Sequence, residues 1–189
     1  MKRFAYTRAD GGVSVVIPVE GCRLCSGYRK DGKDVMLEEP LRLDQIRKDH
    51  GNVEPIFAES EADWLAFVKS RSNIPADAVV VECEHTDLPS DRTFRNAWSV
   101  QQQKVGVDLP KARDIVRNRI RAQRVDIFPR LDVAYQRADE KTDALGKQAV
   151  AQKKQMLRDA PADPRIASAS TPDQLKAALA AISQEMSAV

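Results

Sequence analysis

The stretch DLPKARDIVRNRIRAQR, residues 108–124, marks the point where the sequence changes character. Asp108 is a candidate N-cap before Leu109 and Pro110. Apolar residues then recur at intervals of about three to five as far as Ala138, which predicts an amphipathic helix. From residue 108 onward Ala, Arg, Lys, Gln and Asp dominate, and aromatic residues are few. We therefore expect a helical region at 108–189 that follows a module of a different kind.

Proline and capping residues divide this helical region. Pro129 should kink or split the first helix, because proline lacks an amide hydrogen and its ring clashes with the preceding turn. A second helix is expected at about residues 142–158, and a short connection favours an antiparallel hairpin. The last helix should begin at the cap Thr171, with Gln174 completing a capping box. Its buried stripe is predicted to be Leu175, Leu179 and Ile182.

The first module begins with signals for short strands. Residues 3–7 and 13–19 read as two strands, joined by Asp10-Gly11-Gly12, where glycine accepts the positive φ of a tight turn. Residues 20–33 are polar and contain glycine, so we interpret them as a loop. A short third strand is expected at residues 35–37.

Helix and strand signals alternate in the rest of the module. A short helix is predicted at residues 44–50, and a firmer one at 61–69 with Ser60 as its cap. A Val-rich strand follows at residues 78–82, and a hairpin is expected at 98–107. The predicted fold class is therefore α+β, with a β-rich module at residues 1–107 and the helical region after it.

The composition narrows the classes of function. The 30 Lys and Arg residues nearly balance 28 Asp and Glu residues, which leaves a formal net charge of +2. This balance argues against a chain built mainly to neutralise phosphates or to coat an anionic membrane. No run approaches the roughly 18 to 20 apolar residues that span a bilayer, and no apolar segment follows Lys2 and Arg3, so we expect a chain that is cytosolic when made and has no membrane partner.

The most specific chemical candidate is a group of cysteines with one histidine. Cys22 and Cys25 form a C-x-x-C knuckle, and Cys83 and His85 could supply two further ligands for tetrahedral zinc. The count suits zinc but the spacing does not, because alternate residues of a strand point to opposite faces. The alternative is that the cysteines are ordinary small residues. We expect no cofactor, with structural zinc as the competing interpretation.

Two other classes of site find little support in the sequence. A basic stretch could bind phosphate, but its residues spread around a helix and no aromatic residues are interleaved with them, so a solvated or protein-contacting helix is favoured over nucleic acid. Catalysis would depend on His50 or His85, and neither lies in a recognisable motif. We therefore predict that the chain is not an enzyme. The basic residues are Lys111, Arg113, Arg117, Arg119, Arg121, Arg124 and Arg130.

The segment DLPSDRTFRNAW, residues 87–98, contains two aromatic residues and two arginines. Phe94 and Trp98 could anchor a partner, while Arg92 and Arg95 could bond to its carboxylates or carbonyls. These four residues are the candidate protein-docking site. The alternative is that Phe94 and Trp98 are core residues that fasten the β-rich module to the helices.

This segment resembles a group of tailed-bacteriophage proteins encoded near tail or tail-fibre genes, some of which are named tail assembly or tail-fibre assembly proteins. The resemblance covers about residues 79–182. It continues after residue 98 through residues 107–113, 120–124, 131–138 and 151–166.

The resemblance implies a tail-associated structural protein of the virion, present in the host cytoplasm during assembly. Its partners would be other tail or fibre proteins, in multiple copies, and the family supplies no catalytic residues. One alternative is a tail-fibre assembly chaperone that is absent from the mature particle. Another, from the cysteine pattern, is a small zinc-stabilised nucleic-acid-binding protein.

Overall fold

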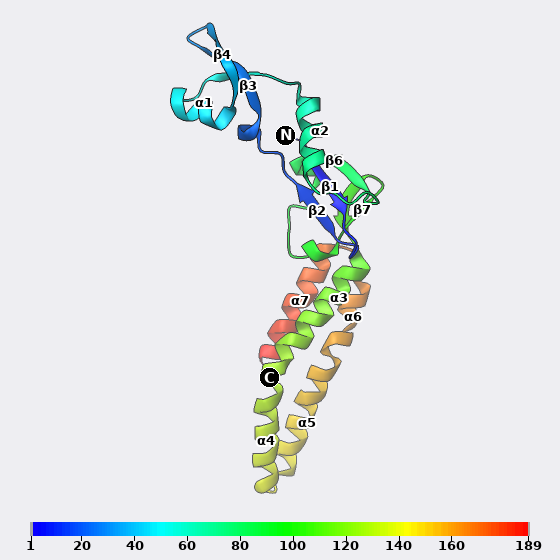
Figure 1. Ribbon diagram of the computed structural model, residues 1–189. Helices are drawn as coiled ribbons and strands as arrows, with labels where there is room; N and C mark the ends of the chain where they lie inside the picture. Colours follow the sequence, from blue (N-terminus) through cyan, green and yellow to red (C-terminus); the bar gives the residue numbers. More distant parts are fainter. Residues whose placement is uncertain (1, 189) are drawn as a thin grey trace. The chain divides into compact units, whose positions relative to one another are not determined.

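The computed structural model describes residues 2–188, which divide into two compact units. Among these residues, the β-rich unit comprises 2–88 and 100–105, and the helical unit comprises 89–99 and 106–188. The fold is α+β, as predicted: small antiparallel sheets come first and helices follow (Figure 1). Within the described residues, no helix is both long and apolar enough to cross a bilayer.

The first sheet of the β-rich unit has the strand order β2-β1-β6, with antiparallel neighbours. Its strands are β1 (Arg3–Thr7), β2 (Val13–Val16) and β6 (Val80–Cys83). The predicted hairpin is confirmed, with Gly11 at φ 71° in the turn. β2 ends at Val16, earlier than predicted, and Pro18 shortly after it cannot donate to a ladder.

Helix α2 (Glu61–Arg71) belongs to the same part of the β-rich unit. The Ser60 hydroxyl accepts a hydrogen bond from the amide of Asp63 at 3.1 Å, which confirms the predicted cap. Trp64 and Leu65 are buried in one cluster with Phe4 of β1. The helix is thereby fixed on the first sheet by three large side chains.

A second sheet has the order β4-β3-β5, and this corrects the prediction of a loop at residues 20–33. Its strands are β3 (Leu24–Lys30), β4 (Lys33–Arg42) and β5 (Glu54–Phe57). Asp31 and Gly32, both at positive φ, form the tight turn between β3 and β4. The predicted strand at 35–37 is therefore part of a longer one.

Helix α1 (Leu43–His50) follows β4 directly and covers the second sheet. It ends at Gly51, whose φ of 78° suits glycine. Its Leu43 and Ile46 are fully buried in a cluster with Cys25 of β3. This small core stabilises a sheet that sequence periodicity does not reveal.

The predicted hairpin at 98–107 is present as β7 (Trp98–Gln101) and β8 (Lys104–Val107). Gln102 and Gln103 form its turn at φ 48° and 60°. The segment before it, residues 89–99, belongs to the helical unit, which therefore begins earlier than the predicted boundary. That segment contains the turn η3 (Arg95–Ala97).

The helical unit contains four long helices and one short one, and most of them begin at a side-chain cap. The long helices are α3 (Leu109–Gln123), α4 (Phe128–Glu140), α5 (Ala144–Asp159) and α7 (Pro172–Ser187), and the short one is α6 (Pro164–Ser168). Asp108, Asp143 and Thr171 each accept a hydrogen bond from an amide in the first turn of their helix, at 3.0, 2.9 and 3.2 Å. Gln174 does not complete the expected capping box, because its side chain accepts from the amide of Ser170, one residue before the cap.

Pro129 stands in the first turn of α4, and the turn η4 (Arg124–Asp126) separates α3 from α4. The predicted split is therefore confirmed. The connection between α4 and α5 is short, and two ion pairs show that these helices run in opposite directions. Asp139 pairs with Lys147 near the turn at 2.5 Å, and Asp132 pairs with Lys154 further from it at 2.7 Å.

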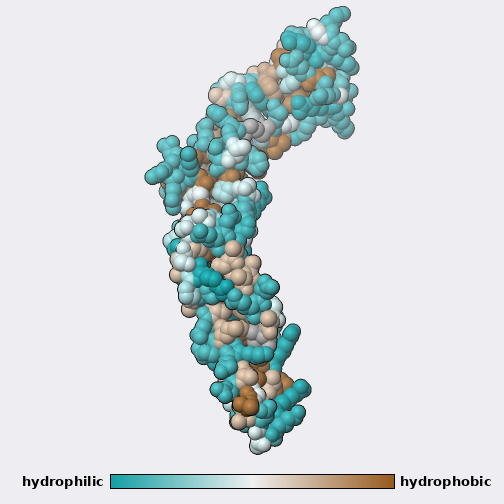
Figure 2. All heavy atoms as spheres, turned by 180° about the vertical axis from the view of Figure 1, so that it is seen from behind, coloured by the Kyte–Doolittle hydropathy of each residue, from teal (hydrophilic) through white to brown (hydrophobic). Residues whose placement is uncertain are grey.

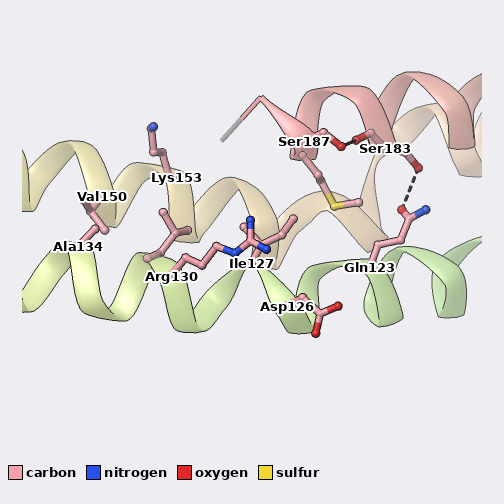
Figure 3. Close-up of a pocket in the computed structure, with 11 residues that line it drawn as sticks. Gln123, Asp126, Ile127, Arg130, Ala134, Val150, Lys153, Ser183 and Ser187 are labelled. Atoms are coloured by element: carbon pink, nitrogen blue, oxygen red, sulfur yellow. Dashed lines mark hydrogen bonds between the residues drawn. The ribbon is translucent and has the colours of Figure 1, made fainter.

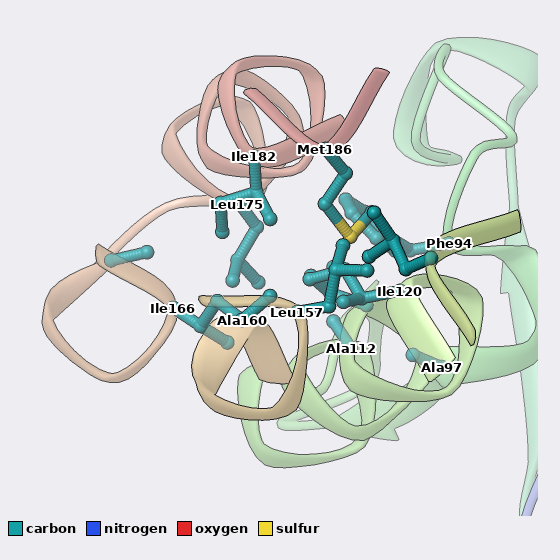
Figure 4. Close-up of a cluster of buried hydrophobic side chains, with 13 residues drawn as sticks. Phe94, Ala97, Ala112, Ile120, Leu157, Ala160, Ile166, Leu175, Ile182 and Met186 are labelled. Atoms are coloured by element: carbon teal, nitrogen blue, oxygen red, sulfur yellow. The ribbon is translucent and has the colours of Figure 1, made fainter. Parts of the chain in front are cut away.

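The core of the helical unit lies between α3, the end of α5, α6 and α7 (Figure 4). The predicted stripe of α7 is present, with Leu175 and Ile182 buried and Leu179 packed against the cluster. Phe94, from the segment before η3, is part of the same cluster. The further members include Val116, Ile120, Leu157, Ile166 and Met186.

Candidate functional site

A groove lies beside the α4–α5 hairpin of the helical unit. The hairpin extends beyond the C-terminal end of α7, so α7 covers only the part of it nearest α3 (Figure 1). The groove begins at the last turns of α7 and continues along α4 and α5, with a volume of about 780 Å³. It is lined by Gln123, Asp126, Ile127, Arg130, Leu131, Ala134, Val150, Lys153, Ser183, Met186 and Ser187.

The floor of the groove is apolar and its edges carry charge. Ala134 and Val150, which are half-buried, face one another across the hairpin (Figure 3). Arg130 lies along the α4 edge, and Lys153 projects outward from α5. The Asp126 carboxylate points away from α5. The groove thus combines an apolar floor, in which Ala134 and Val150 are the small residues, with basic side chains at its edges.

The basic character continues along α4 beyond the groove. Arg137 follows Arg130 by seven residues and lies on the same line of α4, and Lys141 is the residue directly after the end of that helix. Within residues 2–188, none of the three forms an ion pair. We call Arg130, Arg137 and Lys141 the basic stripe.

Two acidic residues of α4 form ion pairs within the hairpin. Asp132 and Asp139 are occupied by Lys154 and Lys147, and both lysines lie over the ring of Tyr135, at 4.9 and 5.8 Å from its centroid. The hydrogen bond to the Asp139 carboxylate raises the pKa of Lys147. One side of the hairpin is therefore closed by internal ion pairs, while the groove side carries the basic stripe.

The β-rich unit has an apolar surface of its own. Ile17, Val19, Leu24 and Phe67 are 50, 61, 42 and 60% exposed, and they line a hollow of about 300 Å³ together with Trp64. Figure 2 shows hydrophobic surface among the strands of this unit and again near the tip of the α4–α5 hairpin. Contiguous apolar surface of this kind is typical of protein contacts. We call these four exposed residues the apolar patch.

The structure buries two of the four residues expected to form the docking site and leaves the other two exposed. Phe94 and Trp98 are only 2 and 3% exposed, so they are core residues, which is the alternative that the sequence left open. Arg92 and Arg95 lie on the surface. A docking role for the two aromatic rings would require them to leave the core, and we therefore withdraw them as surface anchors.

The four candidate zinc ligands are not brought together. Cys22 is exposed and its sulfur accepts a hydrogen bond from Arg42 at 3.1 Å. Cys25 and Cys83 are buried in β3 and β6, where burial raises the pKa of both thiols, and His85 lies in the turn η2 (His85–Asp87). No group of three His, Cys, Asp or Glu side chains in the described chain is placed to hold a metal ion.

Most arginines of the basic stretch bind the helical unit itself. Arg113, Arg119 and Arg124 donate to the backbone carbonyls of Ala169, Thr93 and Leu157, at 2.9, 2.8 and 3.0 Å. Two others bond within α3, Arg117 to Asp114 and Arg121 to Asn118, both at 2.8 Å. These bonds tie segments of the helical unit together. Arg130, the last of the series, lines the groove.

Comparison with known proteins gives no relative: no family model, no curated protein and no solved structure matches the chain.

Proposed function

We propose that this chain is a structural protein of a bacteriophage tail that acts through protein–protein contacts in the virion. The observation that carries the proposal is the open groove of the helical unit, whose apolar lining includes the small residues Ala134 and Val150. A surface of this shape suits another polypeptide better than a small molecule, which is usually enclosed on most sides. The resemblance of residues 79–182 to tail-associated proteins supplies the biological setting.

The apolar patch supports the same proposal independently. It belongs to the β-rich unit, so each unit has a surface suited to a partner. A protein with two such surfaces can join two neighbours, as an attachment or adaptor component of a tail or fibre does. Its partners would be other tail or fibre proteins, present in multiple copies.

The composition of purified particles tests this proposal. Quantitative mass spectrometry of virions from the encoding phage should detect the chain in a fixed ratio to the tail proteins of the same preparation. A chain that is abundant in the infected cell and missing from the particles would be an assembly chaperone, and the structural role would be wrong. The known tail proteins in the sample serve as internal standards for copy number.

A further inference from the structure

We propose that the groove beside α4 and α5 binds an α-helix of a partner protein. The face of that helix carries small or aliphatic residues, and acidic side chains seven residues apart on it pair with Arg130 and Arg137. The identity of the partner as a virion protein rests on the proposed function, whereas the chemistry of the contact rests on the groove alone.

The shape of the groove specifies a helix. α7 ends at Ser187, near Ile127 and Arg130, while α4 continues to Glu140. Beside α3 the bundle contains α6 and α7, but beyond Ser187 the groove side of α4 and α5 is not covered by a helix of residues 2–188 (Figure 1). α4 has 13 residues and is therefore about 20 Å long at the usual rise of 1.5 Å per residue. A partner helix of about that length would continue the bundle along the line of α7.

The floor sets the size of the side chains that can dock. Ala134 and Val150 are small, so the backbone of an incoming helix can approach closely. Large aromatic side chains would hold it away from the hairpin. Ala, Val and Leu at the spacing of one helical face fill such a groove while burying apolar surface.

The two arginines of α4 determine which charged residues the partner helix should carry. Arg130 and Arg137 are one seven-residue repeat apart, which is about 10 Å along a helix. Carboxylates on a partner helix with the same spacing would face both guanidinium groups at once. The hairpin's own Asp132 and Asp139 are occupied by lysines on another side, so they do not compete for the two arginines.

The same charges argue against a second copy of this chain in the groove. A symmetric contact between two hairpins would place the basic stripe of each copy in one shared interface. Repulsion between like charges would then oppose the burial of Ala134 and Val150. A partner with complementary acidic residues avoids this cost.

Binding of designed helical peptides to the full-length chain tests the inference. The acidic peptide has 21 residues, an Ala/Leu stripe and Glu at seven-residue spacing beside it, and the basic peptide has Lys at the Glu positions. Fluorescence anisotropy at physiological salt measures both dissociation constants. We expect the acidic peptide to bind at least about tenfold more tightly than the basic one, since two ion pairs replace two like-charge contacts.

Charge-reversed variants locate the binding site. Arg130→Glu combined with Arg137→Glu should weaken the acidic peptide about tenfold or more and strengthen the basic peptide. The control, Arg121→Glu combined with Arg158→Glu, makes the same change of charge on exposed arginines outside the groove and should leave both affinities within about twofold. Circular dichroism of each variant verifies that the helices are retained.

Three results would overturn the inference. One is equal binding of the two peptides, and another is an equal effect of the groove and control variants. The third is a dimer in sedimentation velocity that the groove variant dissociates and the control variant does not, since a second copy would then fill the groove. Failure of peptide binding leaves the particle composition unaffected, so it is distinguishable from failure of the tail role.

Discussion

At the scale of single residues, Gly27 shows how closely the second sheet is packed. It lies in β3 where the register with β4 shifts between Cys25 and Gly27. A Cβ atom added at Gly27 would stand 2.5 Å from the carbonyl oxygen of Val35, a distance that real Cβ atoms do not reach. Because that oxygen belongs to the backbone, it cannot rotate away. Gly27 is therefore required by the approach of β4 to β3.

Gly27→Ala should destabilise the β-rich unit by about 1–3 kcal/mol, the usual cost of forcing an extra carbon into a packed site. The matched control is Gly106→Ala in β8, where an added Cβ meets nothing within 4 Å. That substitution should change the free energy of unfolding by less than about 0.5 kcal/mol. Urea unfolding followed by circular dichroism measures both values. Equal midpoints for the two variants would show that β4 can move away from β3 at little cost.

At the scale of elements, charged pairs fix α7 to its neighbours. The Asp91 carboxylate, just before η3, accepts from the Lys176 ammonium on α7 and also pairs its Oδ1 with the Thr93 amide at 2.8 Å. The Lys176 bond, followed by those from Thr93, holds the pKa of Asp91 well below its ordinary value. On α6, Arg165 forms forked bonds to Asp163 and to Glu185 of α7. Both ends of α7 are thereby tied by side chains distant in sequence.

The Asp91–Lys176 pair predicts a defined dependence of stability on pH. A carboxyl whose pKa is lowered in the folded state stabilises the fold above its unfolded pKa of about 3.9, and the stabilisation is lost as the pH falls through the folded-state value. Asp91→Asn should therefore be less stable than the natural chain from pH 6 to 8, and the difference should shrink below about pH 4. Urea unfolding at pH 7, 5 and 3 measures this change.

Lys176→Gln removes the same pair from the other side and provides the second arm of a double-mutant cycle. The double variant should lose no more unfolding free energy than the two single variants lose together. Its remaining loss of stability in acid should come from other groups, such as Asp163, whose pKa Arg165 lowers. If the difference in unfolding free energy between Asp91→Asn and the natural chain grows as the pH falls, the pH dependence does not come from the Asp91–Lys176 pair.

The helices were predictable because their signals are local. Asp108, Ser60 and Thr171 act on amides within their own first turn, and Pro129 acts on the turn before it, so a short window of sequence contains the whole cause. The hairpins at residues 3–16 and 98–107 are likewise set by their turns.

The second sheet could not be predicted from periodicity, because its strands depend on partners that lie far apart in sequence. β3 is polar for much of its length and is held between β4 and β5. The Asp31-Gly32 turn was the available signal, but the polar residues around it favoured a loop. The burial of Phe94 was equally non-local, since it depends on α3 and α7 packing around that ring.

The groove depends on relative lengths that no single segment contains. Ala134 and Arg130 could be assigned to a helix from the sequence, but nothing there shows that α7 ends before covering the hairpin. The spacing of Arg130, Arg137 and Lys141 was a detectable signal. The pairing of Asp132 and Asp139 with lysines, in contrast, depends on how α5 packs against α4.

At the scale of the whole molecule, charge is balanced and apolar surface is exposed. The formal net charge is +2 at pH 7, and the pI calculated from the sequence is about 8.4. Repulsion between molecules is therefore weak at neutral pH and weakest slightly above it. Under these conditions the apolar patch can bring molecules of the chain together.

Phe67 is the residue with which to test this behaviour, because it is large and 60% exposed in the apolar patch. Phe67→Ser should reduce concentration-dependent light scattering, most clearly near pH 8.4, while it changes the free energy of unfolding by less than about 1 kcal/mol. Val125→Ser is the control, since Val125 is 62% exposed but lies in the helical unit outside the patch. Scattering at pH 6 and 8.4, measured at low ionic strength, compares the variants. An equal reduction by both substitutions would mean that exposed apolar side chains act singly, and the apolar patch would then lose its standing as a docking surface.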